Sequence, residues 1–336
     1  MDQDGDAGLS GMKALLITNA GPDIGGGHLS RCLALSQALA ARGVVCSWVL
    51  NENALPQAGA LGMEGIISLR DIFCRESINI AQEADFVIVD SYLAPVDFFS
   101  GISRAAKLVV IDDLHDRGAE FFASVVINYG FGASGELYGS PDCRYLLGPS
   151  YALLRKEYWT LEPEDGRDVL FVPGAADVAG TALDMAGWWS EAHPPLAIAL
   201  GPLVPESRCR AVNEIAGGRG NVRIFRSAAD FPAILSRAGS VICTASVTAY
   251  EALAMRKKTA VFFVAANQDK LGGLLAGMGA AYNIGKWGSS SREEIENAIS
   301  FVPDGTVLRG IVNPRGAVRC AQEVIPILNQ MNHNLI

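Results

Sequence analysis

The chain alternates between short, nearly continuous apolar segments and longer segments with apolar residues at helical spacing. From Leu29 to Leu39 the apolar residues fall on one helical face, which predicts a helix that stops near Arg42 and Gly43. Unbroken apolar runs are typical of parallel strands that are buried on both faces. Such runs predict strands in the first half at Lys13–Thr18, Val44–Leu50, Phe86–Asp90, Leu108–Asp112 and Val125–Asn128.

The same pattern begins again in the second half. The apolar run Asp168–Gly174 leads into a small-residue turn and then into a helix predicted over roughly Val178–Ala192. The polar stretch Leu161–Asp168, which contains proline and glycine, is the predicted linker between the halves. Further apolar runs predict strands at 196–200, 222–225, 240–244 and 259–265.

Strands and helices that alternate in both halves predict an α/β fold with two doubly wound, Rossmann-like domains that face a central cleft. The length of 336 residues fits two domains, and 50% hydrophobic residues are enough for two cores. We expect a tail at residues 1–12, an N-terminal α/β domain at residues 13–160 and a C-terminal nucleotide-binding α/β domain at residues 161–336.

The charge balance limits the class of ligand. Lys and Arg number 27 against 36 Asp and Glu, which gives a net charge of −9. Proteins that bind nucleic acid neutralise many phosphates with Lys and Arg, so a nucleic-acid partner is not expected. A small phosphate ligand remains compatible, because backbone N–H groups can hold it without basic side chains.

The cysteines and the N-terminus indicate a cytoplasmic protein. The 7 cysteines are scattered, with no C-x-x-C pattern, and are expected to be reduced and not to bind zinc. The N-terminus is acidic and glycine-rich, unlike a signal peptide, and we expect it to be disordered. No apolar run approaches the ~18 residues of a membrane span, so none is expected.

The strongest candidate for chemistry is a glycine-rich loop after the first predicted strand. It contains Gly25, Gly26 and Gly27 and ends at His28, where a helix starts. The loop is not a dinucleotide fingerprint, because Ser30 replaces the third glycine, and it is not a P-loop. Glycines allow close approach to a ligand, and a histidine at this point can serve as a general base. The alternative is a histidine that caps the helix or binds a structural partner.

Two further segments follow strand ends in the second half. Thr244–Glu251 brings small hydroxyl residues to the start of a helix, where hydroxyls and free N–H groups can hold a diphosphate. The alternative is helix capping, because Thr248 and Glu251 have the spacing of a capping box. Asn267 and Gln268 open the next helix, and their amides suit sugar hydroxyls, although polar loop residues are equally common there.

The loop at His28 also resembles a known signature. Gly25-Gly26-Gly27-His28-x-x-Arg31-Cys32-Leu33-x-Leu35 is similar to the G-x-G-H-x-x-R-C-L-x-L pattern of the nucleotide-sugar hydrolases of pseudaminic acid biosynthesis. The resemblance covers about residues 13 to 285. Further matches follow in the same order, at Asp90-x-Tyr92, Ile111-Asp112-Asp113, Asn128, Leu147-Gly148-Pro149-x-Tyr151-Ala152-Leu153-Leu154-Arg155, Thr244–Glu251 and Asn267-Gln268.

The resemblance implies a fold like that of the glycosyltransferase-B (GT-B) enzymes, related to the peptidoglycan N-acetylglucosaminyl transferase. In that fold the last helix crosses back to the first domain, and the stretch of roughly Arg315–Asn329 is the candidate here. The implied reaction is hydrolysis of UDP-2,4-diacetamido-2,4,6-trideoxy-β-L-altropyranose to UDP and the free sugar, with inversion at the anomeric carbon. It implies a UDP-sugar partner, and no cofactor or metal.

The resemblance also implies roles for individual residues. His28 would activate water, Glu251 would hold the ribose, and the Thr244–Thr248 turn would hold the diphosphate. Asn267 and Gln268 would contact the sugar. The implied substrate-binding residues are Gly26, Gly27, Arg31, Asp90, Tyr92, Arg155, Gly174, Thr244, Ala245, Ser246, Val247, Thr248, Glu251, Asn267 and Gln268.

The sequence departs from the family pattern at two places. Ile17 and Asn19 stand where the family carries R-x-D, so a charge pair near the implied sugar site is missing and the identity of the sugar is open. The turn that opens the second half, Pro173–Asp177, lacks one glycine of the family pattern. Two other functions stay open: a glycosyltransferase that uses the same donor, and a nucleotide-sugar-binding protein that does not need His28.

Overall fold

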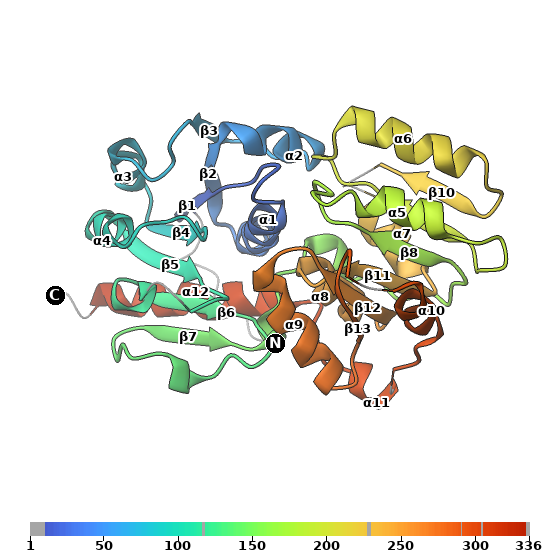
Figure 1. The fold of residues 1–336 in the computed structure, drawn as a ribbon. Helices are drawn as coiled ribbons and strands as arrows, with labels where there is room; N and C mark the ends of the chain where they lie inside the picture. Colours follow the sequence, from blue (N-terminus) through green and yellow to red (C-terminus); the bar gives the residue numbers. More distant parts are fainter. Residues whose placement is uncertain (1–10, 116–117, 227–229, 290, 304, 334–336) are drawn as a thin grey trace.

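The computed structural model describes residues 11–115, 118–226, 230–289, 291–303 and 305–333. Residues 1–10 of the predicted tail therefore lie outside the described residues. Each half of the chain forms one parallel sheet with helices around it, and the two halves lie side by side (Figure 1). The predicted α/β fold is confirmed.

The first half contains a seven-stranded parallel sheet in the order β3-β2-β1-β4-β5-β6-β7. Its strands are β1 (Lys13–Thr18), β2 (Val45–Asn51), β3 (Ile66–Leu69), β4 (Phe86–Asp90), β5 (Lys107–Ile111), β6 (Val125–Asn128) and β7 (Arg144–Leu147). Its α-helices are α1 (Gly27–Ala40), α2 (Leu55–Ala60), α3 (Arg75–Ala81) and α4 (Val96–Ala105). Short 3₁₀ turns lie at Glu52–Ala54, Ala119–Phe121, Gly135–Leu137, Pro149–Tyr151 and Lys156–Trp159.

The second half contains a six-stranded parallel sheet in the order β10-β9-β8-β11-β12-β13. Its strands are β8 (Val169–Val172), β9 (Leu196–Ala199), β10 (Val222–Phe225), β11 (Ser240–Thr244), β12 (Lys258–Phe263) and β13 (Tyr282–Lys286). Its helices are α5 (Thr181–Trp188), α6 (Glu206–Gly217), α7 (Phe231–Arg237), α8 (Val247–Ala254), α9 (Ala266–Gly277), α10 (Arg292–Ser300), α11 (Gly305–Leu308) and α12 (Gly316–His333).

The apolar runs predict all interior strands of both sheets and the edge strand β10, but they do not predict β3, β7 and β13. These three strands also lie at sheet edges and are shorter or more polar, so the hydrophobic pattern is weak there. β7 ends at Leu147, immediately before Gly148. Helix α5 is shorter than predicted: it begins only after Gly180, which has a φ of +72°, and Asp177 accepts a hydrogen bond from its first backbone N–H.

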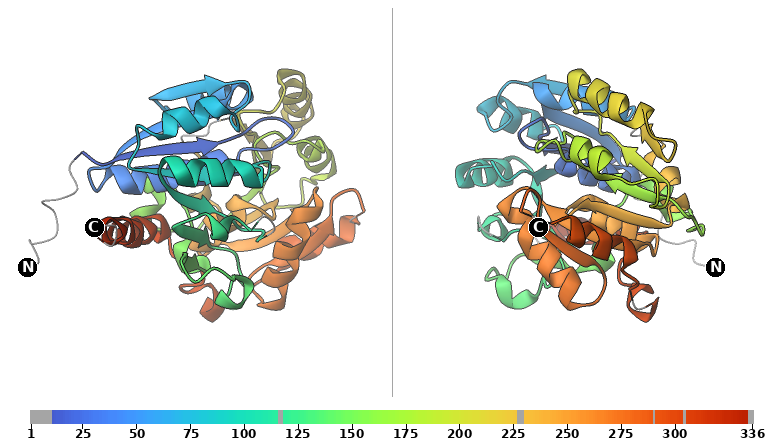
Figure 2. Two further views of the ribbon diagram at one scale, coloured as in Figure 1. Left: turned by 90° about the vertical axis from the view of Figure 1, so that its left-hand side faces the viewer. Right: turned by 45° about the vertical axis from the view of Figure 1, so that its right-hand side comes forward.

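Helix α12 extends from the second half across to the first, where it packs against α1 (Figures 1 and 2). The hydroxyl of Tyr151 donates to Oε1 of Glu323 on α12 at 2.8 Å. The thiol of Cys320, also on α12, lies 3.5 Å from the Tyr151 carbonyl oxygen. The predicted limits of the two domains as folding units stay a prediction.

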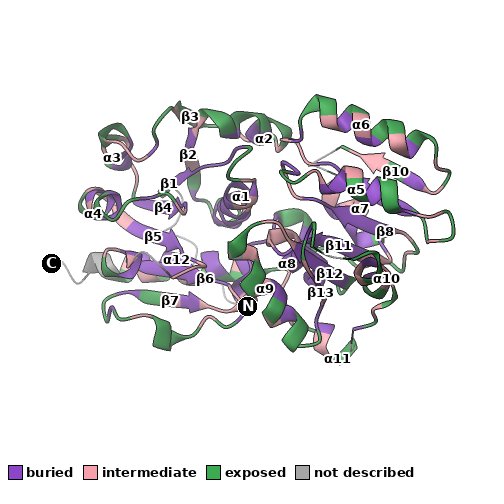
Figure 3. Cartoon of the chain, in the orientation of Figure 1, coloured by how far each residue is buried: buried purple, intermediate pink, exposed green. Residues whose placement is uncertain are grey.

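The buried residues are concentrated in the sheets and on the inner faces of the helices (Figure 3). One apolar cluster contains Leu16 of β1, Leu35 of α1, Leu253 of α8 and Ile325 of α12. The two halves therefore share part of a core, which places the carboxyl ends of their strands opposite one another.

Candidate functional site

A cleft of about 660 Å³ lies between the two halves. The loops that follow β1, β4, β5 and β6 form one wall, and the loops that follow β8, β9, β11 and β12 form the other. Ligands of doubly wound α/β domains bind beyond the carboxyl ends of the strands, so this is where such a fold places a ligand.

Most of the predicted site residues line this cleft. Asp90 does not: it is fully buried beneath His28 and Arg31, and it can act on a ligand only through them. Asn267 lies in α9, but its side chain is outside what the structure describes. The residues that line the cleft are Gly26, Gly27, His28, Arg31, Tyr92, Arg155, Gly174, Thr244, Ala245, Ser246, Val247, Thr248, Glu251 and Gln268.

The glycine-rich loop delivers His28 to the cleft. Gly25 has a φ of +83°, which favours glycine, and Gly26 is the residue before the first turn of α1. His28 is the second residue of the helix, so the alternative in which it caps α1 is wrong. A Cβ on Gly27 would lie 3.6 Å from Cγ2 of Val247, so the start of α1 closely faces the start of α8.

His28 has a buried carboxylate partner. Its Nδ1 lies 2.7 Å from Oδ1 of Asp90, which is fully buried. An ionised carboxylate only accepts hydrogen bonds, so Nδ1 carries the hydrogen and donates it to Asp90. Nη2 of Arg31, which can only donate, lies 3.0 Å from the same nitrogen and donates instead to Oδ1 of Asp90 at 2.6 Å. Within the described chain no residue binds Nε2, and this nitrogen keeps its lone pair on the opposite side of the ring. His28 is thus oriented as a base toward the cleft.

Arg31 connects two carboxylates behind the cleft wall. Its Nε donates to Oδ2 of Asp90 at 2.5 Å, and its Nη1 donates to Oδ2 of Asp113 at 2.6 Å. Burial tends to raise the pKa of Asp90, but Arg31 and then His28 outweigh it, and the pKa lies well below the usual value. The carboxyl group of Asp90 is therefore ionised at neutral pH.

Asp113, Tyr92 and Tyr129 complete this cluster. Tyr92 donates its hydroxyl hydrogen to Oδ2 of Asp113 at 2.9 Å, and its ring meets the His28 ring edge-on with centroids 4.3 Å apart. Nη1 of Arg31 donates to the hydroxyl of Tyr129 at 3.3 Å. Asp113 and Tyr129 were not among the predicted site residues; the match at Ile111-Asp112-Asp113 is the signal that points to the first of them.

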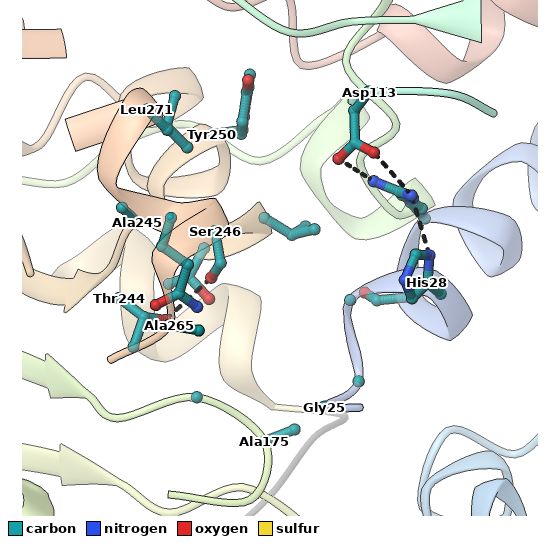
Figure 4. Close-up of a pocket in the computed structure, with 18 of the residues that line it drawn as sticks. Gly25, His28, Asp113, Ala175, Thr244, Ala245, Ser246, Tyr250, Ala265 and Leu271 are labelled. Carbon is teal, nitrogen blue, oxygen red and sulfur yellow. Dashed lines mark hydrogen bonds and ion pairs between the residues drawn. The ribbon is translucent and has the colours of Figure 1, made fainter. Parts of the chain in front are cut away.

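The opposite wall is the turn from β11 into α8. The hydroxyls of Thr244 and Ser246 lie 3.0 Å apart, and Ser246 immediately precedes the helix. Thr248 lies inside the helix, so the capping-box alternative for Thr248 and Glu251 is wrong. The first backbone N–H groups of a helix have no partner within it and favour an anion. Figure 4 shows this turn across the pocket from His28 and Asp113.

Glu251 lies one helical turn further into α8. It is only 5% exposed and lines the cleft. Burial raises its pKa to about 7, although Arg155, Tyr158 and Thr248 act in the opposite direction. Glu251 therefore changes charge near neutral pH, which is unusual for a carboxyl group.

Other predicted residues shape this half of the cleft. Oε1 of Gln268 accepts a hydrogen bond from the backbone N–H of Val264 at 3.0 Å, which fixes the side chain beside the loop after β12. Gly174 has a φ of +91°, and a Cβ there would lie 3.7 Å from Oγ1 of Thr244. The Gln268 hydrogen bond thus fixes the loop after β12, and the absence of a side chain at Gly174 keeps the space beside Thr244 open.

The described residues contain no group of three or more His, Cys, Asp or Glu side chains that could hold a metal ion. Among the helices that the structure describes, none combines the length and apolarity needed to cross a membrane.

Comparisons with known proteins agree with this architecture. No protein-family model matches the chain. The chain is similar to calicheamicin glycosyltransferase CalG4, with a TM-score of 0.62 at 14% identity over 95% of this chain and 99% of that one. It is similar to S. aureus MnaA, solved with UDP, with a TM-score of 0.62 at 10% identity over 97% and 98% of the two chains. The chain has the GT-B fold.

A curated sequence relative carries the resemblance further. The chain is 23% identical over 279 residues to the UDP-2,4-diacetamido-2,4,6-trideoxy-beta-L-altropyranose hydrolase of Campylobacter jejuni subsp. jejuni. The alignment covers 80% of this chain and 97% of the relative. The motifs predict a resemblance to this hydrolase family. The alignment confirms it as a sequence similarity over 80% of the chain.

Proposed function

We propose that this chain is a UDP-sugar hydrolase that cleaves the bond between the anomeric carbon and the diphosphate. The observation that carries the proposal is His28, whose Nδ1 donates to buried Asp90 and whose Nε2 is left for the cleft. It lies across the cleft from the Thr244–Ser246 turn, where an anion is favoured. A base and a leaving-group site on opposite walls suit attack on the carbon between them.

In this mechanism Nε2 of His28 takes a proton from water as the water oxygen attacks the anomeric carbon. The glycosidic C–O bond breaks on the opposite side, and UDP leaves with the bonding electrons. Attack opposite the leaving group inverts the anomeric centre. The N-terminal N–H groups of α8 and the Thr244 and Ser246 hydroxyls stabilise the charge that develops on the diphosphate.

The remaining residues bind the substrate. Glu251 accepts hydrogen bonds from the ribose hydroxyls, and Tyr92 contacts the sugar from the first half. Asn267 and Gln268 contact the sugar from the second half. The similarity to the Campylobacter jejuni hydrolase supports a 2,4-diacetamido-2,4,6-trideoxyhexose as that sugar and a place in pseudaminic acid biosynthesis.

Incubation with this UDP-sugar in ¹⁸O-water tests the proposal. The expected result is release of UDP and incorporation of the label into the free sugar. Label in UDP would show attack at phosphorus and overturn the mechanism. UDP release only after addition of a sugar acceptor would show a glycosyltransferase, and binding of UDP-sugar without release would show a binding protein.

A variant of the proposed base completes the test. The substitution His28→Asn should abolish turnover and leave UDP affinity unchanged, because the nucleotide contacts lie on the opposite wall. Full activity in His28→Asn would remove the proposed base.

A further inference from the structure

Asp113 presents a carboxylate to the cleft on the same wall as His28. It lies two residues after the end of β5, lines the cleft and is 22% exposed, whereas Asp90 is fully buried. Figure 4 shows it beside His28 and across from the Thr244 turn. A ligand in the cleft can therefore reach Asp113 directly.

The hydrogen bonds of Asp113 leave room for another donor. Oδ2 accepts from Arg31 at 2.6 Å and from Tyr92 at 2.9 Å. Oδ1 accepts one long bond, from Nη2 of Arg31 at 3.3 Å. A carboxylate offers about four acceptor positions, so Asp113 has capacity on the oxygen that is bound least.

Asp113 also keeps its negative charge. Burial tends to raise its pKa, but Arg31 outweighs that effect and the pKa lies below the usual value. An ionised carboxylate can only accept hydrogen bonds, so it selects ligand groups that donate them. Hydroxyl and amide N–H groups of a sugar are such donors, whereas the diphosphate would be repelled.

We propose that Asp113 orients the sugar of the substrate by accepting a hydrogen bond from one of its hydroxyl or amide N–H groups. This inference rests on the proposed function, and it adds a specificity-determining residue to it. Arg31 binds both Asp113 and Asp90, and Asp90 in turn binds His28. The guanidinium group of Arg31 therefore holds both the carboxylate that binds the sugar and the carboxylate that orients the base. This arrangement determines the position of the anomeric carbon relative to Nε2 of His28.

The test measures binding in a His28→Asn background, where the substrate is not consumed. Calorimetry gives the affinity for UDP and for UDP-2,4-diacetamido-2,4,6-trideoxy-β-L-altropyranose, with and without the additional substitution Asp113→Asn. Loss of a hydrogen bond to a charged group weakens binding by about 10- to 100-fold. We expect that loss for the UDP-sugar only, with UDP affinity changed by less than about threefold.

Two control variants separate this role from others. Asp23 is exposed and lines the same cleft, so Asp23→Asn removes the same charge without the proposed contact and should affect UDP and UDP-sugar equally. Tyr92→Phe removes the hydroxyl that Asp113 holds. If Asp113 acted only by holding Tyr92, then Asp113→Asn would cause no further loss of UDP-sugar affinity in a Tyr92→Phe background, and the inference would be overturned.

The affinities for UDP and UDP-sugar also separate a failure of the Asp113 contact from a failure of the proposed function. Equal weakening of UDP and UDP-sugar by Asp113→Asn would show a general disturbance of the cleft and overturn the role of Asp113. Binding of UDP-sugar without hydrolysis by the unaltered chain would overturn the proposed function alone, since the affinities would still test Asp113. Absence of detectable UDP-sugar binding would overturn both.

Discussion

Tyr250 of α8 packs edge-on against Tyr129 of the first half, with ring centroids 5.0 Å apart. Phe131 also stacks on the Tyr250 ring, with ring centroids 5.2 Å apart. Tyr250 immediately precedes Glu251, and Tyr129 accepts a hydrogen bond from Arg31. The two halves therefore meet through aromatic rings where the cleft wall that carries Thr244 and Glu251 joins the wall that carries His28.

Removal of this aromatic contact should destabilise the protein strongly. Tyr250 is only 6% exposed, and truncation of a buried aromatic side chain costs about 3–5 kcal/mol. We expect Tyr250→Ala to lower the free energy of unfolding in urea by an amount in that range. Phe121 is 64% exposed, and Phe121→Ala should change the same quantity by less than about 0.5 kcal/mol. Similar losses in both variants would contradict the aromatic contact as a source of stability.

Replacement of Asp90 by asparagine should impair catalysis and spare nucleotide binding. In Asp90→Asn the amide can donate to Nδ1 of His28, which favours the tautomer with hydrogen on Nε2 and removes the base from the cleft. We expect kcat to fall by about 10²- to 10⁴-fold, with the dissociation constant for UDP unchanged. The comparison is with His28→Asn, which should be at least as inactive. A kcat close to that of the unaltered chain would show that the carboxylate does not orient the base.

The hydrophobic pattern predicts the buried interior of the fold well and its polar connections poorly. β1, β4 and β6 match their predicted limits because both faces of these strands are buried, which requires a nearly unbroken apolar run. β13 contains Asn283 and Gly285, and its pairing with β12 is irregular, so it carries no such run. Tertiary pairing, and not local sequence, makes it a strand.

The candidate site likewise contains features that the local sequence predicts and features that it does not. The glycine run before His28 and the small residues at Thr244 are local signals, and the structure places both segments on the cleft. The network around Arg31 is not local, because Asp90 and Asp113 reach it from the ends of two other strands. Sheet order decides which strand ends are neighbours, and no spacing within the sequence encodes that order.

Glu251 should make stability depend on pH. Its pKa is about 7 in the folded chain, against 4.5 for an ordinary glutamate. Between these values the folded state binds more protons than the unfolded state, so the free energy of unfolding decreases as pH rises and levels off above pH 7. The loss is on the order of 3 kcal/mol.

The matched variant is Glu251→Gln, which cannot ionise. Urea unfolding of both chains at several pH values between the two pKa values and above them checks the effect. The variant should gain stability relative to the unaltered chain as pH rises through this window. Asp90 does not contribute there, because its lowered pKa confines its effect to acid pH below about 4. Parallel pH profiles for the two chains would show that Glu251 is not forced toward the neutral form.

The docking of α12 should depend on the absence of a side chain at Gly316. A Cβ at this position would lie 2.4 Å from the carbonyl oxygen and 2.5 Å from the nitrogen of Ala152, which are backbone atoms that cannot rotate away. Overpacking of this kind costs about 1–3 kcal/mol. Gly316→Ala should therefore lower the free energy of unfolding and loosen α12. The thiol of Cys320, fully buried beside Tyr151, should then react faster with a thiol reagent under native conditions.

The control for this prediction is Gly187, which lies within α5 and has open space where a Cβ would stand. Gly187→Ala should leave the rate of the Cys320 reaction unchanged and stabilise the chain by about 0.5–1 kcal/mol. An unchanged Cys320 rate in Gly316→Ala would show that the close contact with Ala152 does not control how α12 docks.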